Sequence, residues 1–134
     1  MKHSIIYCEP ERYASFPNIC GDGKGGHWVV FRQAGPATAE AALTETHTHQ
    51  DRDSRIMLTH RPKGLSDWSE AKVVWEAEAD GLAVNDPSLT VLSDGSLLLR
   101  YARWKLVPTA RRAELEGPVM RHFPRTAEVG RMTG

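Results

Sequence analysis

The sequence lacks an excess of charge of either sign, and it also lacks long hydrophobic runs. Lysine plus arginine and aspartate plus glutamate each number 17 in 134 residues, so the formal net charge is zero. Binders of nucleic acid or of anionic membranes show a basic excess, so neither class is expected. The longest apolar runs are only a few residues, whereas a membrane-spanning helix needs about 20. We therefore expect no nucleic-acid partner and no membrane partner.

Cysteine is scarce, and the first residues do not resemble a secretory signal. The two cysteines, Cys8 and Cys20, are too few for a disulfide framework, and we expect both to be free thiols. The apolar stretch that follows Met1 is shorter than the roughly 7–15 residues of a signal peptide. These features predict a cytoplasmic location. They also leave the chain to build its core from apolar residues, which make up 40% of it.

The chain does contain a repeat: one hairpin pattern occurs twice. Placing Pro17 on Pro87 gives an offset of 70 residues, and we match the apolar run 29–32, which ends in arginine, to the run 97–100. Gly and Asp-Gly between apolar runs predict a tight hairpin turn in each copy. The apolar runs are continuous, which is typical of strands buried on both faces. We predict antiparallel strands near 16–20, 27–33, 54–60, 71–76, 87–92 and 96–103.

One period of this repeat holds four predicted strands in two hairpins, which indicates an all-β fold. Four antiparallel strands repeated along a chain are typical of a β-propeller blade, although the usual repeat is about 40–50 residues. The excess length lies in residues 35–53, a long loop of the kind that is usually functional. A short helix is an alternative for 37–43 and for 109–116, and neither changes the fold class.

The stretch 13–103 resembles the sialidase superfamily, whose members are six-bladed propellers with Asp-box repeats. The Asp-box, Ser-x-Asp-x-Gly-x-x-Trp, lies on the turn between the third and fourth strands of a blade. Here the equivalent turn runs from Arg61 to Trp68. Trp68 fits the pattern, Gly64 lies one place early, and Arg61 and Lys63 hold the Ser and Asp positions. The Asp-box is structural in that family, so Trp68 is expected to pack between strands.

The resemblance implies antiparallel four-stranded blades of a six-bladed propeller that is incomplete in this chain. Within a single domain, 1–134, residues 3–8 would be a closing strand, 13–78 the first blade and 84–134 a partial second blade. The segment 104–124 shows no second hairpin, and the tail is expected to end before it reaches a strand. Because so few blades cannot close a ring, we expect missing C-terminal blades or a homo-oligomer.

One segment carries ionisable residues at alternate positions, so that an extended backbone would point them to one side. They are Glu45, His47, His49, Asp51 and Asp53. Three interpretations remain open: a solvated polar loop, a site for zinc or a similar metal ion built from His-x-His and carboxylates, and a carboxyl that acts as general acid and base. The third is the prediction we carry forward, with no metal and no cofactor.

The resemblance implies a sialidase-like exo-glycoside hydrolase that acts on a glycan. In sialidases the acid/base aspartate lies in this loop, and Asp51 is the closest match, with Asp53 as the backup. Such a carboxyl needs a pKa that burial or a neighbouring charge has raised, and the charges could come from His47, His49, Arg52 and Arg55. The alternative is a non-catalytic carbohydrate-binding or structural propeller module.

Arginines complete the predicted site. The Arg-Ile-Pro motif of sialidases corresponds to Ser15-Phe16-Pro17, so its arginine is missing, and Arg12 is the nearest replacement. Arg32 and Arg100 are predicted to line a central funnel and to contact the substrate. The family's other substrate arginines and its Tyr nucleophile belong to later blades. We expect Asp51 to share one end of the blades with Arg32 and Arg100, and Trp68 to lie at the opposite end.

Overall fold

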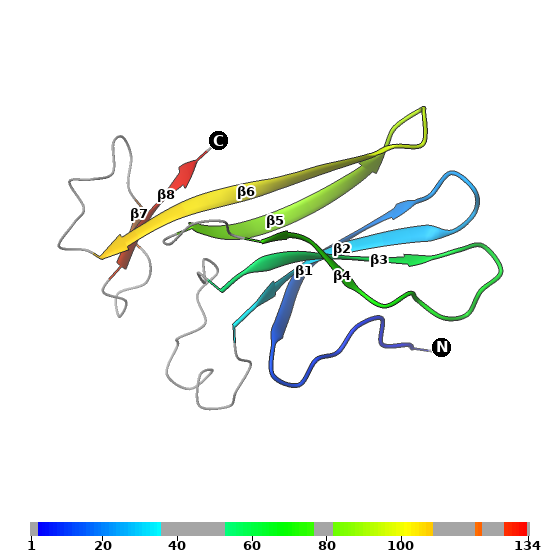
Figure 1. Ribbon diagram of the computed structural model, residues 1–134, viewed down its shortest axis with the longest axis horizontal. Coiled ribbons are helices and arrows are strands. Elements are labelled where there is room, and N and C mark those ends of the chain that lie inside the picture. Colours follow the sequence, from blue (N-terminus) through cyan, green and yellow to red (C-terminus); the bar gives the residue numbers. More distant parts are fainter. Residues whose placement is uncertain (1–2, 36–52, 77–81, 109–119, 122–127, 134) are drawn as a thin grey trace.

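Two antiparallel β-sheets make up the fold (Figure 1). The computed structural model describes residues 3–35, 53–76, 82–108, 120–121 and 128–133, and these contain strands and no helix. The first sheet has the order β1-β2-β3-β4 and consists of β1 (Tyr13–Gly21), β2 (His27–Ala34), β3 (Arg55–Arg61) and β4 (Lys72–Glu76). The second has the order β5-β6-β8-β7 and consists of β5 (Leu82–Val91), β6 (Leu97–Pro108), β7 (Met120–Arg121) and β8 (Glu128–Thr133).

The all-β class and the six predicted strands are confirmed, and two predictions about the chain ends are wrong. Residues 3–8, predicted as a closing strand, form no strand and belong to neither sheet. The tail does reach a strand: β8 pairs with the last part of β6, from Arg103 to Pro108. The segments 37–43 and 109–116, with their helical alternatives, lie outside the described residues.

The two hairpins repeat with a constant offset of 70 residues through both strands. Ile19 pairs with Val29 in the first hairpin, and Leu89 pairs with Leu99 in the second. The predicted match of run 29–32 to run 97–100 is therefore wrong by two residues, and the structural equivalents are 99–102. The reason is that the two turns have equal length, from Gly21 to His27 and from Val91 to Leu97.

Each hairpin also carries a β-bulge at the same place in its first strand. The register shifts between Ser15 and Asn18 in β1, and between Asn85 and Ser88 in β5. Phe16 and Asp86, which directly precede the two prolines, have positive φ angles of 51° and 47°. Positive φ is unusual for a residue with a Cβ, and proline suits a bulge because it donates no ladder hydrogen bond. The repeat therefore extends to an uncommon backbone conformation.

The two sheets pack face to face across one hydrophobic cluster. Val30 and Ile56 of the first sheet meet Val84 and Leu89 of the second, and all four side chains are buried. Polar bonds tie the sheets together as well. Arg32 Nε donates to the carbonyl oxygen of Val84 at 2.8 Å. The backbone N–H groups of Val84 and Leu89 donate to Ser54 Oγ at 2.8 Å and to Asn18 Oδ1 at 2.9 Å.

The opposite face of the first sheet has its own smaller cluster of Val29, Phe31 and Met57. Tyr7 covers part of it, with its ring centroid 4.6 Å from that of Phe31. Trp68 packs on the same cluster, and the Arg61 guanidinium lies 5.0 Å from its ring centroid. The predicted packing role of Trp68 is confirmed.

Candidate functional site

Six polar side chains gather where β1 and β3 begin and β2 ends. We call them the strand-end cluster; they are Tyr7, Glu9, Arg12, Gln33, Asp53 and Arg55. β2 is antiparallel to both β1 and β3, so the end of β2 lies beside their beginnings. Side chains from β2 and β3, and from the segments that precede β1 and β3, therefore meet at one end of the first sheet.

Gln33 is the centre of the larger part of this cluster, and its side chain is fully buried. Its amide nitrogen donates to Glu9 Oε2 at 2.6 Å and to the Tyr7 hydroxyl, and its amide oxygen accepts from Arg55 Nε. A buried amide costs free energy unless such partners satisfy it. The network therefore fixes the segment 7–9 against the end of the sheet.

The Tyr7 hydroxyl and the Glu9 carboxylate form a hydrogen bond in which Tyr7 is the donor. The Tyr7 hydroxyl donates to Glu9 Oε2 at 2.5 Å. Burial, followed by this bond and the charge of Glu9, raises the pKa of Tyr7 to about 12. The same bond, together with that from Gln33, lowers the pKa of Glu9. The phenol is therefore neutral and the carboxylate is charged at neutral pH, so Glu9 is an acceptor and not a proton donor.

Arg12 and Asp53 form the more accessible part of the cluster. Arg12 Nη1 donates to Asp53 Oδ2 at 3.0 Å, and the side chains of Arg12 and Asp53 are 25% and 61% exposed. Two residues predicted separately, one as a substitute substrate arginine and one as the backup acid/base group, are thus brought into contact. Asp53 lies two residues before β3, so this pair lies at the end of the sheet where β2 ends and β3 begins.

The other predicted site residues are distributed differently. His47, His49 and Asp51 lie outside the described residues. Arg32 is fully buried between the sheets and donates to Val84, so the structure gives it a structural role instead of a funnel-lining one. Arg100 is exposed.

The two arginines do not converge as predicted. Leu97 and Leu99 of β6 pack toward the first sheet, and side chains alternate along a strand. Arg100 therefore points to the far side of the second sheet, whereas Arg32 lies between the sheets. Their predicted equivalence rested on the two-residue error in the alignment of the hairpins.

The opposite end of the sheet carries a second polar group, built around the β1–β2 turn. Asp22 Oδ1 accepts from the backbone N–H groups of Lys24 and Gly26, both at 2.8 Å, and Asp22 Oδ2 lies 2.9 Å from His60 Nε2. The His60 ring stacks on Trp28, with centroids 3.9 Å apart. The bonds from His60 and the backbone lower the pKa of Asp22 to about 2.

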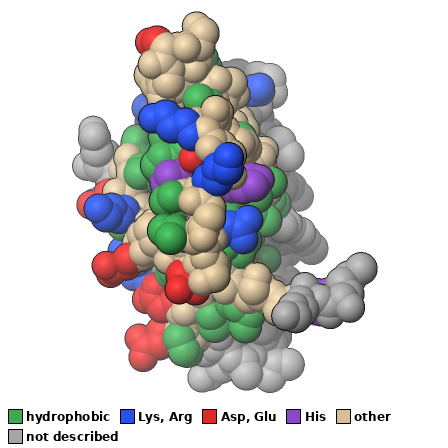
Figure 2. Space-filling model, turned by 90° about the vertical axis from the view of Figure 1, so that its right-hand side faces the viewer, with side chains coloured by type: hydrophobic (Ala, Val, Ile, Leu, Met, Phe, Trp, Pro, Cys, Tyr) green, Lys and Arg blue, Asp and Glu red, His purple; other side chains and the backbone are tan. Residues whose placement is uncertain are grey.

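The contacts of this second polar group hold the β1–β2 turn in its conformation. Figure 2 looks at the end of the molecule that carries the turns and shows histidine side chains between basic and apolar ones. A Cβ on Gly26 would lie 2.5 Å from the Arg61 carbonyl oxygen, so only glycine fits this close approach. Trp68 follows β3 and Asp53 precedes it, so these two residues lie at opposite ends of that strand. The predicted separation of Trp68 from Asp51 involves a residue outside the described ones.

Metal-ion clusters and membrane-spanning helices are both absent from the residues that the structure describes. Within them no group of three or more His, Cys, Asp or Glu side chains is placed to hold a metal ion. No helix there is long and apolar enough to span a membrane. Cys8 and Cys20 are both free thiols, as expected.

Sequence reasoning missed the central residue of the cluster. Gln33 follows an apolar run and pairs with Arg55 across the sheet, and the one available signal was a polar residue at the end of a buried strand. Glu9 carried no signal, because the bond that ties it to the sheet comes from Gln33, 24 residues away in the sequence. No protein-family model, curated protein or solved structure matches this chain, and the relation to the sialidase superfamily stays a prediction.

Proposed function

We propose that this chain is part of a sialidase-like β-propeller that acts on a glycan at the strand-end cluster. The first sheet is a four-stranded meander with its strands in chain order, as in a propeller blade. Its first hairpin returns 70 residues later with the same register and the same bulge, and the two hairpins pack face to face. Two stacked antiparallel sheets that share one repeated hairpin support the propeller proposal.

The observation that carries the glycan proposal is the Arg12–Asp53 pair. A guanidinium offers donors and a carboxylate offers acceptors, and sugar hydroxyl groups need both. Both side chains are partly exposed, so a ligand can reach them. Asp53 is also two residues from Asp51 in the sequence.

The proposed activity is exo-glycoside hydrolysis, with Asp51 as the general acid and base and Asp53 as the backup. A general acid must protonate the leaving glycosidic oxygen and therefore has to lie within hydrogen-bond reach of it. The Arg12–Asp53 pair would hold the sugar beside this group. Glu9 does not compete for the role, because its lowered pKa keeps it charged.

The second candidate is a carbohydrate-binding module without hydrolysis. The observation that favours it is that most side chains of the strand-end cluster are hydrogen-bonded to one another: Gln33 bonds to Glu9, Tyr7 and Arg55. Arg32 is also occupied, by Val84. These groups support the site, and the ligand contacts would come from the Arg12–Asp53 pair, whose side chains are 25% and 61% exposed.

The test is a ligand-observed NMR titration of the 134-residue chain with N-acetylneuraminic acid, galactose and N-acetylglucosamine. We expect Arg12→Ala and Asp53→Asn to weaken binding of the preferred sugar by about tenfold or more, as loss of a charged hydrogen bond should. Asp67→Asn is the matched control, because Asp67 is an exposed aspartate in the β3–β4 turn at the other end. No binding of any of the sugars would refute the glycan proposal.

Hydrolysis of chromogenic glycosides of the bound sugar by the complete propeller, which would include the later blades that carry the nucleophile, then separates the two candidates. In that protein Asp51→Asn should abolish hydrolysis and leave the circular dichroism spectrum unchanged. If the variant hydrolyses the substrate at the original rate, Asp51 is not the acid/base group. Sugar binding without hydrolysis by the complete propeller would support the binding module.

A further inference from the structure

The two hairpins differ sharply in how their first strands are covered. Pro87 is buried and Leu89 is 6% exposed, because both lie against the first sheet. Their equivalents in β1, Pro17 and Ile19, are exposed, and Ile19 is 57% exposed. The register and the bulge are the same in both strands, so the difference comes from the neighbour and not from the hairpin. β5 has a sheet against this face, and β1 does not.

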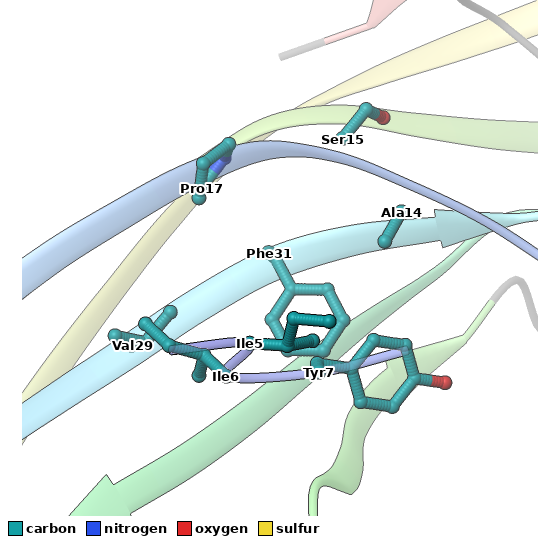
Figure 3. Close-up of a pocket in the computed structure, with 8 residues that line it drawn as sticks. All are labelled: Ile5, Ile6, Tyr7, Ala14, Ser15, Pro17, Val29 and Phe31. Carbon is teal, nitrogen blue, oxygen red and sulfur yellow. The ribbon is translucent and has the colours of Figure 1, made fainter. Parts of the chain in front are cut away.

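An open apolar pocket marks the uncovered face. It has a volume of about 350 Å³ and is lined by Ile5, Ile6, Tyr7, Ala14, Ser15, Pro17, Val29 and Phe31. Figure 3 shows Ile5, Ile6 and Phe31 close together below β1, with Pro17 above them. Ile5 is 81% exposed although its neighbours are apolar. Exposed aliphatic side chains around a hollow are typical of a protein-binding surface.

The chain also carries the surface that should cover this face. The face of the first sheet that packs on the second includes Trp28 and Cys20, which are cross-strand partners. Their equivalents in the second sheet, Leu98 and Thr90, are also cross-strand partners. They point away from the first sheet, and Leu98 is 53% exposed. The second sheet thus exposes the counterpart of the face that covers Leu89.

We propose that a second copy of this chain stacks head to tail on the first. The Leu98 face of the second sheet of one copy covers the Pro17–Ile19 face of the first sheet of the next. The packing of the two sheets within one chain is the template for this contact. Asn18 Oδ1, which accepts from Leu89 N–H across the existing contact, has Ser88 as its equivalent in the second sheet. Ser88 of one copy would therefore approach the Ile19 N–H of the next.

Such a contact joins two different surfaces, so it propagates until a ring closes. Each chain brings two sheets, and propellers hold about four to eight blades, so closed rings would contain about two to four copies. This assembly does not depend on the proposed action on glycans, because the contact surface excludes Arg12 and Asp53. Either proposal can fail without the other.

The test is sedimentation velocity of the 134-residue chain over a wide range of concentration, with one charge placed on each surface. The original chain should form a discrete small oligomer. Ile19→Asp and Leu98→Asp should each weaken association by about tenfold or more, because each buries a charge without a partner. Leu65→Asp is the matched control: Leu65 is 60% exposed in the β3–β4 turn and touches neither surface.

Mixing the two variants decides the geometry. An Ile19→Asp chain retains its Leu98 face, and a Leu98→Asp chain retains its Ile19 face. The equimolar mixture should therefore form a heterodimer, while each variant alone stays monomeric. A symmetric contact between two Ile19 faces predicts instead that Leu98→Asp alone dimerises, which would overturn the proposal. A monomeric original chain would overturn it as well. Thermal unfolding of each variant checks that it is folded.

Discussion

Truncating the equivalent residues Leu89 and Ile19 should have very different effects on stability. Leu89 is 6% exposed and packs in the cluster between the sheets, so Leu89→Ala removes buried methyl groups and leaves a cavity. We expect the free energy of unfolding to fall by about 3 kcal/mol, within the range of about 2–5 kcal/mol for such changes. Ile19 is less than half buried in a single chain, and no cavity forms, so Ile19→Ala should cost about 1 kcal/mol.

The assay is urea-induced unfolding followed by tryptophan fluorescence, at a protein concentration where the chain is monomeric. The two variants serve as controls for each other, because strand position, bulge and cross-strand partner are matched. Equal losses would refute the inference that the first sheet covers only the second hairpin. A loss for Ile19→Ala that grows with protein concentration would instead indicate that a second copy buries this residue.

Two further predictions concern pH. Because the pKa of Tyr7 is raised to about 12 in the folded chain, stability should fall as pH rises from about 10 to about 12; Tyr7→Phe should remove this part of the loss, and a phenolate absorbance titration complete near pH 10 for all tyrosines would contradict it. Because the pKa of Asp22 is lowered to about 2, its contribution is present above about pH 4 and lost as pH falls toward 2. Asp22→Asn should be less stable at pH 7 and lose less stability on acidification than the original chain, whereas parallel stability curves for the two proteins would contradict the role of Asp22 in the turn.

Much of the fold could be predicted because it depends on local signals. Glycines close the tight turns, and Gly25 and Gly95 have φ angles of 88° and 84°, which a side chain would disfavour. The continuous apolar runs beside them predict buried strands. Pro17 and Pro87 gave the offset because a bulge tolerates proline at one defined place in the strand. These features involve residues close together in the sequence.

The site could be predicted only in part, because its contacts join distant segments. The sequence predicts Asp53 as a backup acid/base group from its place before a strand, and Arg12 as a substrate arginine from its closeness to the position of the Arg-Ile-Pro motif. Their contact, 41 residues apart, follows from the register of β1, β2 and β3, which no local pattern specifies. The error over Arg32 had the same origin. The length of the turn sets which residue of β6 is equivalent to Arg32. A shift of two residues leaves the side chain on the same face of the sheet but changes the neighbours that it meets.

The comparison of the two hairpins indicates where this fold accommodates chemistry. At the turn end they agree: Asp22 N–H donates to the Gly26 carbonyl at 3.1 Å, and Leu92 N–H donates to that of Ser96 at 2.8 Å. At the other end they diverge, since Gln33 corresponds to Arg103 in the shared register. The turn end must be alike because both hairpins need the same closure. The strand end is under no such constraint, so it can differ between copies, and there the first sheet places its buried amide, its Tyr–Glu pair and its accessible Arg–Asp pair. A site built at this end can change without disturbing the hairpin that supports it.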